Sequence, residues 1–92
     1  MVLTEIEISK ILNTDLGNWK LIDSKIETFI KRDDMKDLGS MVKKIWDFAE
    51  KVDHHPDILL TYSGIKIILF THDQSGITEK DIDFARSLEK IY

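Results

Sequence analysis

Three histidines are the residues of this chain best suited to proton transfer, and two of them are adjacent. His54 and His55 lie in the segment EKVDHHPDILLTY, residues 50 to 62, and His72 follows later. An imidazole has an unperturbed pKa of about 6.5, so it can donate or accept a proton near neutral pH. The three side chains predict acid and base catalysis if the fold brings them into one cavity.

The neighbours of the histidine pair indicate a helix end. His55 precedes Pro56, the only proline of the chain, whose ring disfavours the helical conformation in the residue before it. Glu50 lies four residues before His54, hence on the same side if the helix persists through its last turn. A strand that closes at His72 beside this helix end would bring the three imidazoles together.

A zinc site and a structural role are the alternatives for these histidines. Adjacent His54 and His55 cannot easily aim at one ion from an extended strand, and the chain has no H-E-x-x-H pattern and no cysteine. We therefore expect no metal ion and no other cofactor. A surface or structural role stays open at this point, because single histidines in small domains commonly have one.

The composition is typical of one globular domain over residues 1–92. The formal net charge of −4 argues against a nucleic-acid surface, which needs clustered Lys and Arg to displace counterions from phosphates. The N-terminus MVLTEIEISK lacks the pattern of a signal peptide, and no apolar window reaches the roughly 18 residues of a membrane span. We expect a cytoplasmic protein that binds neither nucleic acid nor membrane.

Cap residues and periodicity predict the elements of the first half. Thr4, with Glu7 three residues later, is typical of a helix N-cap, and this helix is expected to run to about Asn13. Aromatic and β-branched residues then predict two short strands, over 19–22 and 26–31.

The second half repeats the order of helix and two strands. Apolar residues spaced by three and four predict a helix over 36–53 with one buried side. Two apolar, β-branched segments, 58–62 and 65–71, predict a hairpin with Ser63 and Gly64 as its two-residue connection. In the second strand, Ile68 and Phe70 share a face that is too apolar for plain exposure to water, so a pocket or a partner subunit is expected to cover part of it.

A last helix begins after Thr78, with Asp81 interpreted as its capping carboxylate and with Ala85, Leu88 and Tyr92 on one side. The order is helix-β-β-helix-β-β-helix. Hairpin-connected strands favour an α+β two-layer sandwich, in which a four-stranded antiparallel sheet carries helices on one face. Trp19 and Trp46 are interpreted as packing residues or part of a subunit contact.

The histidines and their spacing resemble the motif of the pterin-4a-carbinolamine dehydratase family. The motif residues are Glu50, His54, His55, Pro56, Tyr62, His72 and Asp81. The segment THDQSGITEKDIDFA, residues 71–85, is also similar to that family. The chain departs from the family pattern at Ile58, where many members place a tryptophan beside the pterin pocket, and at Lys80, where an arginine is common.

The resemblance implies an enzyme that dehydrates 4a-hydroxytetrahydropterin to quinonoid dihydropterin and water. It implies that His54, His55 and His72 line the pterin site and serve its acid and base steps. We expect His55 to lie closest to the leaving hydroxyl and Glu50 to orient an imidazole. The same resemblance implies that further residues frame the pterin, namely Asp53, Phe70, Thr71 and Asp73.

The resemblance also implies partners. Family members form dimers or tetramers and recycle tetrahydrobiopterin after aromatic amino acid hydroxylation, if the host has such a hydroxylase. Animal members also act as dimerisation cofactors for a homeodomain transcription factor. The alternative to catalysis is therefore a pterin-binding or protein-interaction module, including a role in molybdopterin metabolism.

Overall fold

The computed structural model describes residues 1–91, so Tyr92, expected on one side of the last helix, lies outside the described residues. The predicted element order is confirmed, with one short 3-10 helix added. The elements are α1 (Glu5–Asp15), β1 (Lys20–Ile22), β2 (Lys25–Lys31), α2 (Met35–Val52), β3 (Asp57–Thr61), β4 (Gly64–Leu69), the 3-10 helix η1 (His72–Gln74) and α3 (Glu79–Leu88).

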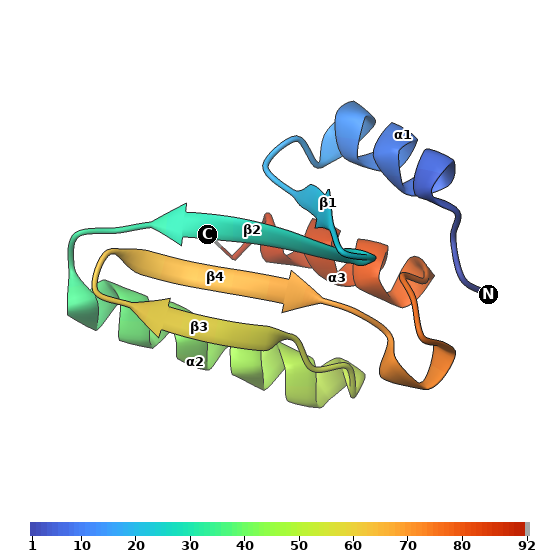
Figure 1. The fold of residues 1–92 in the computed structure, drawn as a ribbon. Coiled ribbons are helices and arrows are strands. Elements are labelled where there is room, and N and C mark those ends of the chain that lie inside the picture. Colours follow the sequence, from blue (N-terminus) through green and yellow to red (C-terminus); the bar gives the residue numbers. More distant parts are fainter. Residues whose placement is uncertain (92) are drawn as a thin grey trace.

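The strands form one antiparallel sheet in the order β1-β2-β4-β3. Figure 1 shows α2 and α3 behind this sheet and α1 beside β1. Ile65, Ile67 and Leu69 of β4 point toward the helices and are fully buried. The α+β sandwich with helices on one face of the sheet is therefore confirmed.

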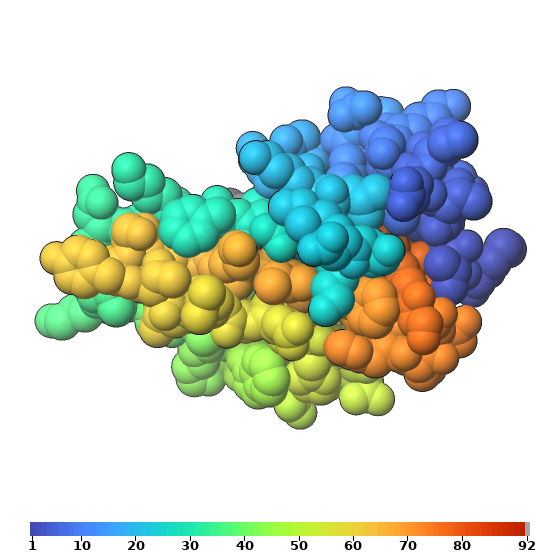
Figure 2. Space-filling model, viewed as in Figure 1, coloured from blue at the N-terminus to red at the C-terminus, as the bar shows by residue number. Residues whose placement is uncertain are grey.

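The opposite face of the sheet carries apolar side chains in contact with solvent. Figure 2 views the molecule from this side, with the strands in front. Phe29 of β2 is 48% exposed and Leu59 of β3 is 56% exposed, while Ile68 and Phe70 are half-buried. Lys66 and Glu27 form an ion pair across β4 and β2, with Nζ and Oε1 3.4 Å apart.

Helix α2 ends where the sequence predicts, and the way it ends determines where the histidines lie. Asp53 takes the left-handed conformation at φ 53°, ψ 44°, which Asp tolerates better than most residues. Its backbone N–H and that of His54 both donate to the carbonyl of Ala49. The chain then reverses into the extended conformation that Pro56 favours in its predecessor.

The predicted end of strand β4 was wrong. Strand β4 ends at Leu69 rather than Thr71: its last pair with β2 is Ile26–Leu69, and β3 begins at Asp57, which pairs with Ile68. Thr71 instead forms an isolated bridge with Gly76. His72 therefore opens the 3-10 helix and does not close a strand.

The hairpin turn between β3 and β4 lies one residue earlier than expected. Tyr62 and Ser63 make the connection, and Gly64 already pairs with Thr61. The hydroxyl of Thr61 accepts from the Gly64 N–H at 3.1 Å and donates to the Gly64 carbonyl at 2.9 Å. These local bonds close the turn and extend the ladder by one pair.

Capping boxes open the two shorter helices, as the sequence predicts. At α1, Thr4 accepts from the N–H of Glu7, and Glu7 accepts from the N–H of Thr4. At α3, Asp81 accepts from the N–H of Thr78 at 3.0 Å, and the hydroxyl of Thr78 accepts from the N–H of Lys80. The hydroxyl of Thr71, two residues after β4, also donates to Asp81 at 2.7 Å, and this bond holds the start of α3 beside the end of β4.

Candidate functional site

A cleft of about 410 Å³ opens where the ends of α2 and β4 meet the start of α3, at the right-hand end of the sheet in Figure 1. Its lining residues are Asp53, His54, His55, Phe70, Thr71, His72, Asp73 and Lys80. The fold thus brings all three histidines to one cavity, together with the four residues expected to frame a ligand. Glu50 lies just outside this lining and touches it through His55.

His54 is held by a buried carboxylate. Its Nε2 lies 2.6 Å from Oδ1 of Asp81, whose side chain is fully buried, while that of His54 is 13% exposed. The ring edge packs against Phe84, with centroids 6.0 Å apart. Asp81 does cap α3 as predicted, but interpreting it only as a cap was incomplete, because its other oxygen reaches the candidate site.

His55 is held by an exposed carboxylate. Its Nε2 lies 2.9 Å from Oε1 of Glu50, and the two side chains are 35% and 63% exposed. The expectation that Glu50 lies beside His54 was wrong, because α2 stops at Val52 and the left-handed turn at Asp53 carries His54 away toward α3. Glu50 does contact an imidazole, but that imidazole belongs to His55.

Trp46 also belongs to this neighbourhood, although sequence reasoning assigned it only to packing or a subunit contact. Its ring centroid lies 4.9 Å from that of His55, at an interplanar angle of 56°. Trp46 and Glu50 are four residues apart on α2 and so share a helix face. That spacing was the available signal that Trp46 flanks whichever histidine Glu50 contacts.

His72 also lines the cleft and is exposed. Its ring meets that of Phe70 edge to face, with centroids 5.1 Å apart and an interplanar angle of 75°. Lys25 places its ammonium 5.3 Å from the centre of the Phe70 ring. Phe70 thus offers a partly buried aromatic wall beside an imidazole, an arrangement suited to a flat heterocyclic ligand.

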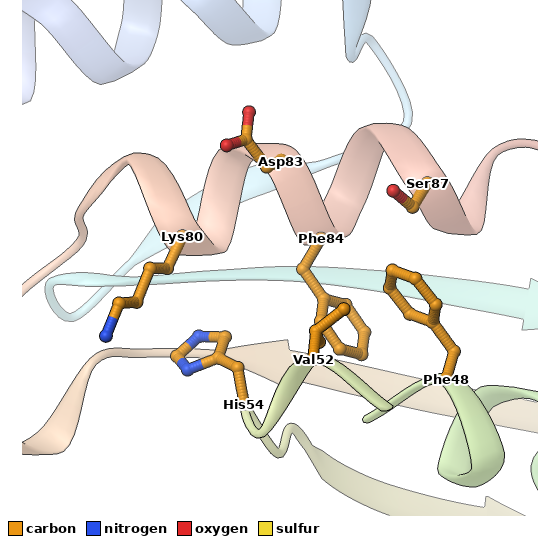
Figure 3. A pocket seen from close by; sticks show the side chains of 7 residues that line it. All are labelled: Phe48, Val52, His54, Lys80, Asp83, Phe84 and Ser87. Atoms are coloured by element: carbon orange, nitrogen blue, oxygen red, sulfur yellow. The ribbon is translucent and has the colours of Figure 1, made fainter. Parts of the chain in front are cut away.

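A second cavity of about 270 Å³ adjoins the cleft and shares His54 and Lys80 with it. Figure 3 shows Phe48 and Val52 of α2 facing Phe84 of α3 across this cavity, with the Lys80 side chain extending toward His54. The rings of Phe48 and Phe84 lie 5.0 Å apart, centroid to centroid. His54 and Lys80 therefore line both cavities, and the second cavity has the more apolar lining.

The two departures from the family pattern lie in different surroundings. Lys80 lines the cleft and adds a positive charge to a lining that also contains Asp53 and Asp73. Ile58 pairs with Ile67 on the helix-covered face of the sheet and packs against the core. Ile58 therefore does not line the cleft.

Two imidazoles with carboxylate partners and a third opposite them can move protons to and from a ligand held between them. Within residues 1–91, no group of three or more His, Asp or Glu side chains is arranged to hold a metal ion. Among the described helices, none is long and apolar enough to cross a membrane.

Comparison with known proteins connects this geometry to a family. The family model described as pterin 4 alpha carbinolamine dehydratase matches residues 1–91. Relatives from Nostoc sp. and Sulfolobus acidocaldarius, which carry that enzyme's name in provisional form, are 37% and 33% identical over 98% and 99% of this chain. These matches cover 96% and 99% of the two relatives.

A solved structure has the same fold. The crystal structure titled transcriptional coactivator/pterin dehydratase from Brucella melitensis superposes with a TM-score of 0.89, at 32% sequence identity, over 99% of this chain and 98% of its own. The chain, with its three histidines in one cleft, therefore belongs to the pterin-4a-carbinolamine dehydratase family.

Proposed function

We propose that this protein dehydrates a 4a-hydroxytetrahydropterin to quinonoid dihydropterin and water. The observation that carries the proposal is the convergence of His54, His55 and His72 on one cleft, two of them with a carboxylate on Nε2. Membership of the family supports the substrate class. The reaction needs one proton delivered and one removed, and imidazoles suit both steps near neutral pH.

The reaction is balanced by two proton transfers. The C4a–oxygen bond breaks, its electron pair stays on the oxygen, and a proton from a protonated imidazole converts the leaving hydroxide into water. A ring nitrogen of the pterin loses its proton to a neutral imidazole, and the freed electron pair forms the new double bond to C4a. We assign proton delivery to His55, because its side chain is 35% exposed and its Nε2 is held by the carboxylate of Glu50. His54 and His72 accept or position the other proton.

The remaining lining residues are proposed to hold the pterin. The Phe70 ring offers a stacking surface, while Asp53, Thr71 and Asp73 offer carboxylate and backbone groups to the polar edge of the heterocycle. Glu50 is proposed to orient His55 at 2.9 Å. The chemistry requires no electron transfer, so no redox cofactor is included in the proposal.

The proposal is tested by following the absorbance of quinonoid dihydropterin formed from synthetic 4a-hydroxytetrahydropterin. The spontaneous reaction sets the baseline. We expect clear acceleration by the wild-type protein and a loss of about 100-fold or more in His55→Ala, the range for removing a well-placed acid or base. Lys43→Ala, a change on the exposed side of α2, should retain full activity. Wild-type protein that does not exceed the baseline would refute the dehydratase.

An interaction role is the second candidate, and the exposed apolar face of the sheet favours it. Phe29 and Leu59 are about half exposed on that face, and contiguous exposed apolar surface commonly marks an interface. The Brucella structure also carries the coactivator name in its title. We propose that copies of this chain associate as a homodimer or homotetramer and thereby cover this face of the sheet. Light scattering after size exclusion would contradict this if only monomer were present at micromolar concentration.

The histidine variants separate the two candidates. Self-association or a protein-interaction role should survive His55→Ala, whereas dehydration should not. A cytoplasmic location, a place in tetrahydrobiopterin recycling beside an aromatic amino acid hydroxylase, and the molybdopterin alternative stay predictions.

A further inference from the structure

Asp81 is a buried carboxylate at which several hydrogen-bond donors converge. Its Oδ2 accepts from the hydroxyl of Thr71 at 2.7 Å and from the N–H of Thr78 at 3.0 Å. Because the Thr71 hydroxyl is committed to Asp81, the 2.8 Å contact between Thr71 and Thr78 has the Thr78 hydroxyl as donor. One oxygen of Asp81 is thus fully used inside the protein, and the other faces His54.

The contact with His54 determines which ring nitrogen carries a proton. A carboxylate only accepts hydrogen bonds, and Oδ2 of Asp81 already accepts two, so we infer that Nε2 of His54 is the donor to Oδ1 across the 2.6 Å contact. In a neutral imidazole the second nitrogen is then unprotonated, which leaves Nδ1 as the free proton acceptor. Figure 3 shows one nitrogen of the His54 ring turned toward α3, which carries Asp81, and the other turned away from it.

We propose that Asp81 is a positioning residue that holds His54 with its proton on Nε2 and thereby makes Nδ1 the proton-accepting atom of the site. This assignment rests on the dehydratase function proposed above. It specifies that His54, rather than His72, accepts the second proton. His54 takes the proton of the pterin ring nitrogen at Nδ1, and Nε2–H stays hydrogen-bonded to Asp81. The positive charge that develops on the imidazole is then stabilised by the buried carboxylate beside it.

The pair formed by His55 and Glu50 is more exposed to solvent than the pair formed by His54 and Asp81. Glu50 is 63% exposed, so water competes for both partners and the ring can exchange its hydrogen bond with solvent. Asp81 is fully buried and has no such competition. A fixed tautomer suits a base whose free nitrogen must already be unprotonated, whereas a proton donor near solvent can be reprotonated after each turnover.

The decisive variant is Asp81→Asn. Its amide oxygen can still accept from Thr71 and Thr78, but its NH₂ group now donates to Nε2 of His54, so the imidazole proton must move to Nδ1. We expect kcat to fall by at least about tenfold, and by up to the ~100-fold or more that loss of a positioned base costs, with KM little changed. Glu7→Gln makes the equivalent change in the capping box of α1 and should leave kcat unaltered.

Two measurements distinguish positioning from a structural role. Two-bond ¹H–¹⁵N correlation spectra should show His54 protonated on Nε2 in the wild type and on Nδ1 in Asp81→Asn. In a His54→Ala background, Asp81→Asn should lower kcat by less than twofold, because the residue it acts through is gone. A wild-type His54 protonated on Nδ1, or an equal loss of kcat in both backgrounds, would overturn the inference. If the wild type were inactive, the dehydratase would fail, and the spectra would still decide the tautomer.

Discussion

Replacing Glu50 by Gln tests whether the partner of His55 supports catalysis only by orientation. Nε2 of His55 and Oε1 of Glu50 are 2.9 Å apart, but the side chains are 35% and 63% exposed. Exposed pairs are screened by water and salt and contribute about 0.2–1 kcal/mol. Since about 1.4 kcal/mol corresponds to tenfold, kcat/KM should fall by no more than about fivefold. The Tm should change by only a few degrees, because about 1 kcal/mol shifts a domain of this size by roughly 4–8 °C.

The assay is the initial rate of quinonoid dihydropterin formation at low and high ionic strength. Asp47→Asn is a matched control, because Asp47 is also on α2, is 64% exposed and forms a 2.8 Å ion pair with Lys43 away from the cleft. The control should leave kcat/KM unchanged. The deficit of Glu50→Gln should shrink at about 1 M salt, where the screening length is near 3 Å. A loss above about 50-fold that persists in salt would refute the screening argument and place Glu50 in the chemistry itself.

Three further predictions follow from local geometry. A Cβ at Gly64 would lie 2.3 Å from a backbone oxygen of β2, so Gly64→Ala should destabilise the fold by about 1–3 kcal/mol in denaturant unfolding. A Cβ at Gly39 in α2 would have no atom within 4 Å, so Gly39→Ala should stabilise the fold by about 0.5–1 kcal/mol in the same measurement. Because Lys80 contributes a positive charge to the cleft, Lys80→Ala should raise the KM for the pterin by about fivefold with little change in kcat. Lys80→Arg should restore the KM. A fall in kcat larger than the rise in KM would contradict this prediction. Hydrogen bonds from the backbone N–H and the hydroxyl of Thr4 lower the pKa of Glu7, so its stabilising contribution is present above the pKa of an unfolded Glu and is lost as pH falls through the folded value. The Tm difference between wild type and Glu7→Gln should therefore shrink toward about pH 3, and a difference independent of pH would refute the capping argument.

Features that depend on neighbours along the chain could be predicted from the sequence. The apolar stripe of α2, the capping boxes at Thr4 and Thr78, and the exit from the helix before Pro56 are all local, because each is decided by residues within about one helical turn. The resemblance to the family implied eight site residues, of which Glu50 alone does not line the cleft. Strand ends were harder, because the end of β4 depends on how far its pairing with β2 and β3 continues, and that is decided by the registers of strands distant in the sequence.

The histidines at a helix end, the element order and the resemblance to a dehydratase family could all be read from the order of the residues. Which carboxylate each histidine meets depends on how the elements pack. Asp81 and His54 are 27 positions apart, and no periodicity relates them. The left-handed turn at Asp53 sends His54 toward α3 and returns His55 to Glu50. A single backbone conformation thus gave Glu50 a different histidine from the one that helical spacing predicted, because side-chain contacts follow the path of the chain in space rather than separation along it.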